Sequence, residues 1–243
     1  MKLAGRHIVV TGASRGIGRA TAVALVEAGA RVTGCSRNGA ALDELIEELG
    51  ADRCHGVAAD LTDAGEVDRA LGGAVERWGH LDGLVNSAGL ARMARVADGN
   101  PDDWRAMWEI NVLGLALCTR AALPHFPEAG GQVVNLSSLS GHRVPTSGGF
   151  YAATKFAVRA MTEALRLELR AMGNKTRVTA ISPGFVDTEL VDEYLAAGGK
   201  TREDLGLEMI PPEEVARTIV HVLTAPAEVE FNDLILRPRE QKV

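Results

Sequence analysis

Tyr151 and Lys155 are the residues of this sequence whose types and spacing most directly suggest proton-transfer chemistry. They stand four positions apart at the start of a helical pattern, and this spacing places a phenol and an ammonium group on one helix face. A free tyrosine has a pKa of about 10 and a nearby cation favours the phenolate, so we expect Lys155 to lower the pKa of Tyr151. Taken alone, the pair is also typical of a solvated helix face. Whether the pair is catalytic therefore depends on whether the rest of the chain supplies a reaction in which this proton takes part.

The elements that must position this pair alternate between short strands and longer helices. Runs rich in β-branched residues predict strands at His7–Val10, Arg31–Cys35, His55–Ala58, Leu84–Asn86, Val133–Ser137, Val178–Ser182 and Leu234–Leu236. Apolar residues at helical spacing predict helices at Ile17–Ala28, Ala40–Leu49, Glu66–Trp78, Pro101–Leu123, Tyr151–Ala171 and Pro212–Leu223, and glycines stand at helix ends at positions 29, 50, 79 and 173. This alternation predicts a single α/β domain over residues 1–243, with a parallel sheet covered by helices on both faces.

One polar segment breaks this rhythm. It runs from Asp187 to Ile210, includes Gly198-Gly199 and is followed by Pro211-Pro212. Such an insert after a strand end is a candidate lid over a pocket, at residues 187–210, and a plain surface excursion is the alternative.

A glycine-rich loop supplies a partner for the proton. The run Thr11-Gly12-Ala13-Ser14-Arg15-Gly16-Ile17-Gly18 follows the first predicted strand and opens the first predicted helix. Glycines at such a turn let the backbone approach a pyrophosphate closely, and the helix N-terminus offers free amides to the anion. This position favours a dinucleotide-binding loop over an ordinary tight turn, so we expect cofactor contacts from Gly12, Ser14, Arg15, Gly16, Ile17 and Gly18.

The end of the second predicted strand indicates which dinucleotide binds. An acidic residue there would accept hydrogen bonds from the adenosine ribose of NAD. This chain instead has Cys35-Ser36-Arg37, and Arg15 is placed to meet the same ribose from the other side. Two guanidinium groups and a hydroxyl suit a 2′-phosphate, so Ser36 and Arg37 predict NADP(H). Two solvated arginines on a charged rim are the alternative.

Composition bears on the class of function and on the compartment. The net charge is -6 and the basic residues are dispersed, which disfavours nucleic acid as a partner. We expect no membrane span, because no apolar run approaches roughly 20 residues, and no signal peptide, because the glycine loop begins as early as Thr11. Cys35, Cys54 and Cys118 lack metal-ligand spacing, so we expect buried reduced thiols, no metal site and a cytoplasmic location.

The motifs together resemble the short-chain dehydrogenase/reductase family over nearly the whole chain. Seven features follow that family's order and spacing: the glycine loop, Asn86-Ser87-Ala88-Gly89, Asn111, Ser138, Tyr151, Lys155 and Pro183-Gly184. The resemblance implies a Rossmann-type doubly wound parallel sheet of about seven strands, with the active site beyond the carboxyl ends of the strands. The family usually has a second asparagine where this chain has Ser87, so we expect a changed local hydrogen bond at that turn.

The resemblance also implies roles for individual residues. Tyr151 would donate the proton in reduction and accept it in oxidation, and Ser138 would hydrogen-bond the substrate oxygen. Lys155 would also hold the nicotinamide ribose, and Asn111 would anchor a water that links Lys155 to bulk solvent. Asp60 would hold the adenine amino group, and further cofactor contacts are implied for Leu61, Asn86, Ala88, Gly89, Pro183, Gly184, Val186 and Thr188.

The sequence leaves the substrate open. His142 and Arg143 are candidates to hold a carboxylate, and the alternative is that both face solvent; Arg92 and Arg95 pose the same choice. The run Leu236–Gln241 resembles the tail of a family branch that contains NADP-dependent 3-hydroxy acid (serine) dehydrogenases, a clavulanate aldehyde reductase, farnesol dehydrogenases and an animal ketosteroid and carbonyl reductase. These substrates range from small acids to sterols.

The leading hypothesis is an NADP(H)-dependent oxidoreductase that acts on a small-molecule carbonyl or alcohol. The alternatives are a dinucleotide-binding regulator without turnover, a 3-ketoacyl carrier reductase, and an epimerase or dehydratase. A regulator has no need of Ser138, Tyr151 and Lys155, so their presence speaks against it. By resemblance we also expect a homotetramer or homodimer, assembled through the helices predicted at Pro101–Leu123 and Tyr151–Ala171.

Overall fold

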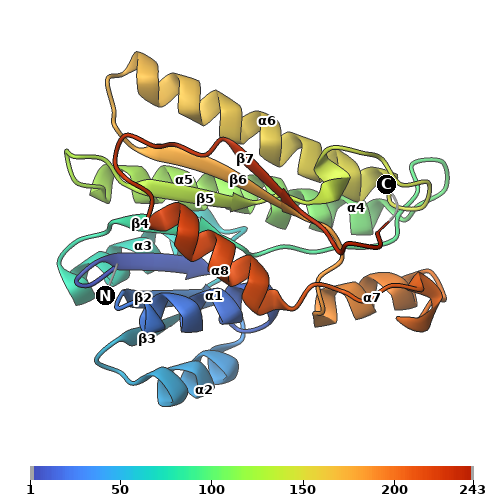
Figure 1. Cartoon of the computed structure of the whole chain (residues 1–243), viewed down its shortest axis with the longest axis horizontal. Helices are drawn as coiled ribbons and strands as arrows, with labels where there is room; N and C mark the ends of the chain where they lie inside the picture. The colour runs from blue at the N-terminus through green and yellow to red at the C-terminus, as the bar shows by residue number, and fades with distance from the viewer. Residues whose placement is uncertain (1–2, 242–243) are drawn as a thin grey trace.

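The strands form one parallel sheet in a computed structural model that describes residues 3–241 (Figure 1). They are β1 (His7–Thr11), β2 (Arg31–Ser36), β3 (Cys54–Ala58), β4 (Gly83–Asn86), β5 (Gln132–Leu136), β6 (Arg177–Pro183) and β7 (Asp233–Leu236). Their order in the sheet is β3-β2-β1-β4-β5-β6-β7. The direction of winding reverses between β1 and β4, so the loops that follow these two strands flank the crevice where such sheets bind ligands. The predicted fold class is confirmed, and each predicted strand is correct to within one residue at either end.

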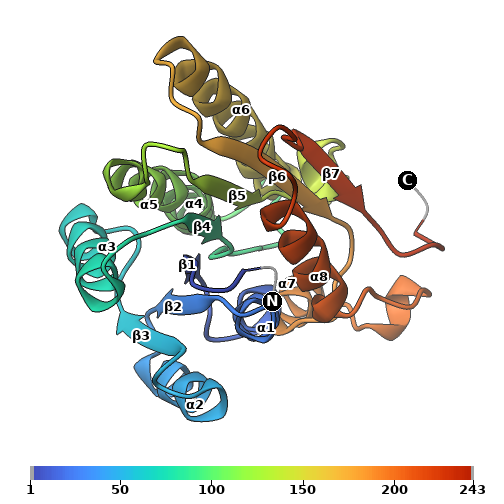
Figure 2. The same ribbon diagram turned by 60° about the vertical axis from the view of Figure 1, so that its left-hand side comes forward.

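Helices cover both faces of this sheet (Figure 2). They are α1 (Gly16–Glu27), α2 (Gly39–Leu49), α3 (Ala64–Trp78), α4 (Pro101–Trp108), α5 (Leu115–Ala122), α6 (Gly149–Ala171), α7 (Glu189–Ala197) and α8 (Pro212–Leu223). Successive strand side chains point to opposite faces, so Ile8 and Val10 of β1 pack with α1, α2 and α8, whereas Val9 packs with α3 and α5. The central strands β1, β4 and β5 are therefore buried at every position. The four glycines predicted at helix ends all have positive φ.

The helix predicted at Pro101–Leu123 is interrupted. A π-helical segment, Glu109–Gly114, separates α4 from α5, and Asn111 lies inside it. The sequence-based expectation that no apolar stretch approaches a membrane span is wrong by length and composition, because the helical stretch from Pro101 to His125 is long and apolar enough to cross a membrane. In this structure the stretch packs against β4, α3 and α6, and 44% of its most apolar window is buried.

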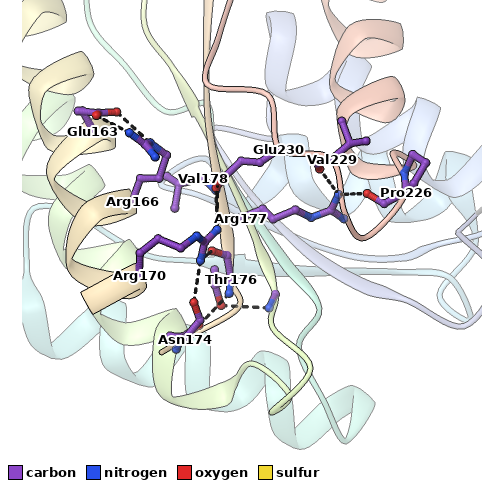
Figure 3. Close-up of polar contacts among 11 residues, drawn as sticks. Glu163, Arg166, Arg170, Asn174, Thr176, Arg177, Val178, Pro226, Val229 and Glu230 are labelled. Atoms are coloured by element: carbon purple, nitrogen blue, oxygen red, sulfur yellow. Dashed lines mark hydrogen bonds and ion pairs between the residues drawn. The ribbon is translucent and has the colours of Figure 1, made fainter. Parts of the chain in front are cut away.

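Polar contacts fix the chain where it enters β7, at the amino ends of the strands (Figure 3). The carboxylate of Glu230 accepts a hydrogen bond from the Val178 amide (2.8 Å). Arg170 Nη2 donates to both of its oxygens, each at 3.1 Å. Arg177 Nη1 donates to the carbonyl oxygens of Pro226 (2.7 Å) and Val229 (2.6 Å). The last strand is therefore held to β6 and α6 by ionic contacts as well as by its ladder.

The polar insert at residues 187–210 contains α7, a helix that the sequence did not predict. The insert begins and ends at one place, because Val186 and Ile210 form a parallel bridge and Asp187 N donates to Ile210 O (2.8 Å). Glu189 and Asp192 lie in the first turn of α7, where acidic side chains favour the positive end of the helix dipole. Because of these charged residues, the sequence of the segment is typical of an irregular polar loop, and the short helix was not predicted.

Candidate active site

The glycine loop forms a cradle for an anion between β1 and α1. Gly12 has a φ of 69°, and a Cβ added to it would lie 2.8 Å from Ala88 Cα. A Cβ on Gly18 would lie 2.2 Å from the Gly12 carbonyl oxygen, so neither position accepts a side chain without backbone movement. Within residues 3–241 no side chain caps the start of α1, and its first turn carries no acid. The amides around Ser14, Gly16 and Ile17 therefore suit the pyrophosphate of a dinucleotide.

Thr11 braces the turn after β4. Its Oγ1 accepts hydrogen bonds from the backbone amides of Ser87 and Ala88, both at 3.1 Å. The turn is thus tied to β1 through main-chain donors, which do not depend on the Ser87 side chain. This explains how the departure from the family's second asparagine is accommodated, and Thr11 is a residue that the sequence reasoning missed.

Asn86 lies in a buried polar chain that crosses the sheet. Its Nδ2 donates to Thr119 Oγ1 (3.0 Å) and to Asn135 Oδ1 (2.9 Å), and Asn135 Nδ2 in turn donates to Thr162 Oγ1 (2.9 Å). The Oδ1 of Asn86 has no hydrogen-bond partner among the described residues. The side chain joins β4 and β5 to α5 and α6, so its contact with a cofactor stays a prediction.

Ser138 and Tyr151 are brought together at the carboxyl end of β5. The Ser138 hydroxyl lies close enough to the half-buried phenol of Tyr151 to lower its pKa. The amide of Ser140 donates to Ser138 Oγ (3.1 Å), so the serine accepts from the backbone and keeps its own O–H to donate. The structure thus brings the two hydroxyls together, and their contact with one substrate oxygen stays a prediction.

Lys155 lies one helical turn below Tyr151, as predicted, but it does not lower the pKa of the phenol. Its Nζ donates to the Leu136 carbonyl oxygen (2.8 Å) and stands 5.9 Å from the centroid of the Tyr151 ring. Burial raises the pKa of Tyr151 to about 12, and Tyr194 adds to this effect, while the nearby Ser138 hydroxyl opposes it. Burial also lowers the pKa of Lys155 to about 8. The expected effect of Lys155 is wrong for this arrangement, because desolvation outweighs a cation that bonds the backbone.

Asn111 ties the loop after β4 to α6. Its Oδ1 accepts from Leu90 N and its Nδ2 donates to Leu90 O, both at 2.8 Å, and Nδ2 also donates to Thr154 Oγ1 (3.0 Å). A Cβ on Gly89 would lie 3.1 Å from Asn111 Oδ1 and 3.8 Å from Lys155 Nζ. Asn111 therefore stands beside Lys155, as predicted; the water that it would anchor stays a prediction.

Of the residues predicted to bind the adenosine end of the cofactor, three lie together and Arg15 lies apart from them. Ser36, Arg37 and Asp60 lie together at the ends of β2 and β3, and hydrogen bonds from Thr62 to Asp60 Oδ1 (2.7 and 2.9 Å) are the main cause that lowers the pKa of this carboxyl. The nearby Arg37 charge lowers it further. Leu61, which follows, is buried in the core.

Arg15 points elsewhere. Its guanidinium pairs with Glu193 of α7, with 2.5 Å between Nη1 and Oε1. The prediction that Arg15 flanks the same ribose as Arg37 is therefore not met in this conformation, because an acidic residue of the insert takes its charge.

The residues predicted to line the nicotinamide follow β6 and turn toward the glycine loop. Pro183 ends β6, Gly184 N donates to Leu236 O (2.7 Å), and Val186 and Thr188 are buried. A Cβ on Gly16 would lie 3.2 Å from Thr188 Cγ2. The structure thus brings the start of the insert to the helix N-terminus of α1.

The side of the site that faces a substrate has few free charges. Arg92 pairs with Glu193 (3.2 Å) and Arg95 with Asp98, while Arg143 is exposed. His142 neither faces a substrate carboxylate nor faces solvent, because its ring points inward and contacts Ser182. Tyr194 of α7 instead stands over Tyr151, with 6.3 Å between ring centroids. Among residues 3–241 no group of three or more histidine, cysteine or acidic side chains could hold a metal ion.

The sequence profile of the short chain dehydrogenases matches residues 6–197. The human protein "Dehydrogenase/reductase SDR family member 11" is 38% identical over 97% of this chain and 95% of its own length. The chain belongs to the short-chain dehydrogenase/reductase family.

Solved structures of this family superpose on nearly the whole chain. A closed form of serine dehydrogenase complexed with NADP+ has a TM-score of 0.91 at 32% identity, covering 98% of this chain and 96% of its own. An alcohol dehydrogenase from the archaeon Thermococcus sibiricus, complexed with 5-hydroxy-NADP, has a TM-score of 0.87 at 28% identity and 98% coverage of both chains. A 3-ketoacyl-(acyl-carrier-protein) reductase from Brucella melitensis, complexed with NADH, has a TM-score of 0.86 at 27% identity, covering 96% and 97%. This chain is therefore a short-chain oxidoreductase by family, and the similar structures hold either nucleotide.

Proposed function

We propose that this short-chain dehydrogenase/reductase transfers hydride between NADP(H) and a carbonyl or alcohol carbon of a small molecule, with Tyr151 as the proton donor or acceptor. The observation that carries the proposal is the proximity of the Ser138 hydroxyl to the Tyr151 phenol, one helical turn from the buried Lys155 and next to an anion cradle. A protein that only binds a dinucleotide needs the cradle but not the hydroxyl pair.

The proton step follows from the environment of each group. The nicotinamide, when bound, supplies or takes the hydride, and reduction leaves negative charge on the substrate oxygen. The pKa of Tyr151, raised to about 12, keeps its proton in place at neutral pH, ready for donation. Ser138 donates a hydrogen bond to the same oxygen and stabilises the charge that develops there, while Lys155 would hold the nicotinamide ribose.

The preference for NADP(H) rests on the end of β2. Ser36 and the exposed Arg37 stand there with no acidic side chain to accept from a ribose 2′-hydroxyl. A 2′-phosphate would find a guanidinium and a hydroxyl instead. Arg15 would add a second guanidinium only after leaving Glu193.

The paired arginines favour an uncharged substrate. Arg92 and Arg95 are already neutralised by acids of the chain, and an aromatic ring, Tyr194, lies over the proton donor. We therefore expect a neutral aldehyde or ketone to enter beneath α7, with residues 187–210 acting as a lid over it. We also propose a homotetramer or homodimer in the cytoplasm, consistent with exposed Trp108, Leu113 and Phe156 and with three buried free cysteines.

A substrate panel tests the proposal. NADPH oxidation would be followed with aldehydes, ketones and hydroxy acids, and NADH would serve as the alternative reductant. We expect turnover with neutral carbonyl compounds and NADPH, lost in Tyr151→Phe while NADPH still binds. NADPH binding without turnover of any carbonyl would support the regulator instead.

A further inference from the structure

Outside the Ser138–Tyr151–Lys155 site, an ionic cluster joins the last strand to α6 and β6. Asp233, the first residue of β7, accepts a hydrogen bond from Arg159 Nε on its Oδ2 (2.8 Å) and from Ser182 Oγ on its Oδ1 (3.0 Å). His142 Nε2 lies 2.9 Å from Ser182 Oγ and 3.3 Å from Asp233 Oδ2. The Ser182 side chain is fully buried, and those of His142, Asp233 and Arg159 are each no more than 35% exposed.

The pattern of donors fixes the state of the histidine. Ser182 gives its hydrogen to Asp233, so it presents only lone pairs to His142. His142 Nε2 must then carry the hydrogen and donate it to Ser182 Oγ and Asp233. Burial is the main cause that lowers the pKa of His142, Arg159 acts in the same direction, and Asp233 opposes both. A histidine that carries a hydrogen on Nε2 completes the cluster.

This cluster holds the far end of the turn that carries Ser138. Arg159 Nη1 donates to the Gly141 carbonyl oxygen (3.0 Å), and His142 is the next residue along the chain. Gly141 N in turn donates to Ser138 O (2.8 Å), within the short 3-10 turn Leu139–Gly141. A Cβ on Gly141 would lie 2.6 Å from Ser137 Oγ and 2.8 Å from Lys155 O. The turn is therefore pressed against the helix of Lys155, and a shift of Gly141 moves Ser138 relative to Tyr151.

We propose that Asp233 is a positioning residue for the reaction, acting through Arg159 and His142 on the turn that aims the Ser138 hydroxyl. It stands on the edge strand and does not touch the reacting atoms. The inference rests on the proposed role of Ser138 toward the substrate oxygen. Asp233 of β7 would thus affect the reaction although it is far from Ser138 in the sequence.

A double-mutant cycle tests this role. Asp233→Asn keeps the shape of the side chain and removes its charge, and we expect kcat to fall about tenfold with the NADPH Kd unchanged, because small misplacements of a catalytic group cost rates of this order. In a Ser138→Ala background the same change should lower kcat by less than about twofold, since its target is gone. An equal loss in both backgrounds would overturn the proposal, because general destabilisation does not depend on Ser138.

A matched control and a second readout complete the test. Glu230→Gln removes a carboxylate from the contacts that fix the chain just before the same strand (Figure 3); Glu230 bonds Val178 and Arg170 and none of Arg159, His142 or Ser182, so this change should leave kcat unchanged. Amide hydrogen exchange at Ser140 and Gly141 should be about tenfold faster in Asp233→Asn and unchanged in Glu230→Gln. Exchange unchanged in Asp233→Asn would refute the positioning role without any substrate. Absence of wild-type turnover would instead count against the proposed function alone.

Discussion

Acid should destabilise this fold through His7, a fully buried histidine at the start of the strand that leads to the glycine loop. Its Nδ1 donates to His80 O (2.6 Å), and its Nε2 accepts from Thr33 Oγ1 (2.9 Å), which itself accepts from Trp78 Nε1 (3.2 Å). Each nitrogen thus has one partner that fits the neutral ring. Protonation would place a second donor where Thr33 donates, inside the sheet.

The magnitude follows from the pKa of the ring. Burial is the main cause that lowers the pKa of His7 from 6.5 to about 4. Between pH 6.5 and pH 4 the unfolded chain binds a proton at His7 and the folded chain does not. The contribution of neutral His7 to the free energy of unfolding is therefore fully present above pH 6.5 and is lost as the pH falls toward 4. One pKa unit corresponds to about 1.4 kcal/mol, so the loss is about 2 kcal/mol at pH 5 relative to pH 7 and about 3 kcal/mol below pH 4. This is a large part of the roughly 5–15 kcal/mol of a typical domain.

Urea denaturation at pH 7 and pH 5 measures this loss. His7→Gln should be less stable than the wild type at pH 7, because it loses hydrogen bonds, but it should lack the His7 share of the acid dependence. We expect the free energy of unfolding to fall about 2 kcal/mol less in the variant between the two pH values than in the wild type. An equal fall in both proteins would refute the reasoning. The difference between the two proteins isolates the contribution of the His7 side chain.

Three further predictions concern the cofactor loops and the thiols. Thr11→Val should leave two backbone amides without an acceptor and cost about 1–3 kcal/mol in urea denaturation, whereas Thr11→Ser should cost less than half of this; equal costs would show that the hydroxyl is not the brace. Arg37→Ala should weaken NADPH binding about tenfold in a fluorescence titration and leave NADH binding unchanged; parallel losses would remove the 2′-phosphate from the argument. Burial raises the pKa of Cys35 to about 12, of Cys54 to about 11, and of Cys118 as well. All three should therefore resist a thiol reagent at pH 8 in the folded protein and react in denaturant, and rapid reaction of the native protein would contradict their burial.

The fold could be predicted because its signals are local. The central strands β1, β4 and β5 are short apolar runs buried at every position, and most helices carry apolar residues at regular spacing. Asn111 is the exception among the helices: its side chain bonds Leu90, which is distant in the sequence, and the helix around it widens into a π segment. Helix α7 was missed because the charges of its first turn resemble those of a loop.

The candidate site could be predicted in residue type and order, and less well in electrostatics. The motif spacing placed Ser138, Tyr151 and Lys155 correctly relative to one another, since they lie on one strand end and one helix. Spacing says nothing of desolvation, so it gave the wrong sign for the pKa shift of the phenol. Motif spacing also could not predict the ion pair between Glu193 and Arg15, because this pair depends on how the insert folds back over the glycine loop.

The most direct measurement of the central claim is single-turnover oxidation of NADPH by the wild type and by Tyr151→Phe, each saturated with the same neutral carbonyl substrate. The variant keeps the ring and loses only the proton. The account predicts a rate at least about a hundredfold lower in Tyr151→Phe, with the NADPH Kd unchanged. A variant that oxidises NADPH at close to the wild-type rate would contradict it, because the substrate oxygen would then take its proton from another group.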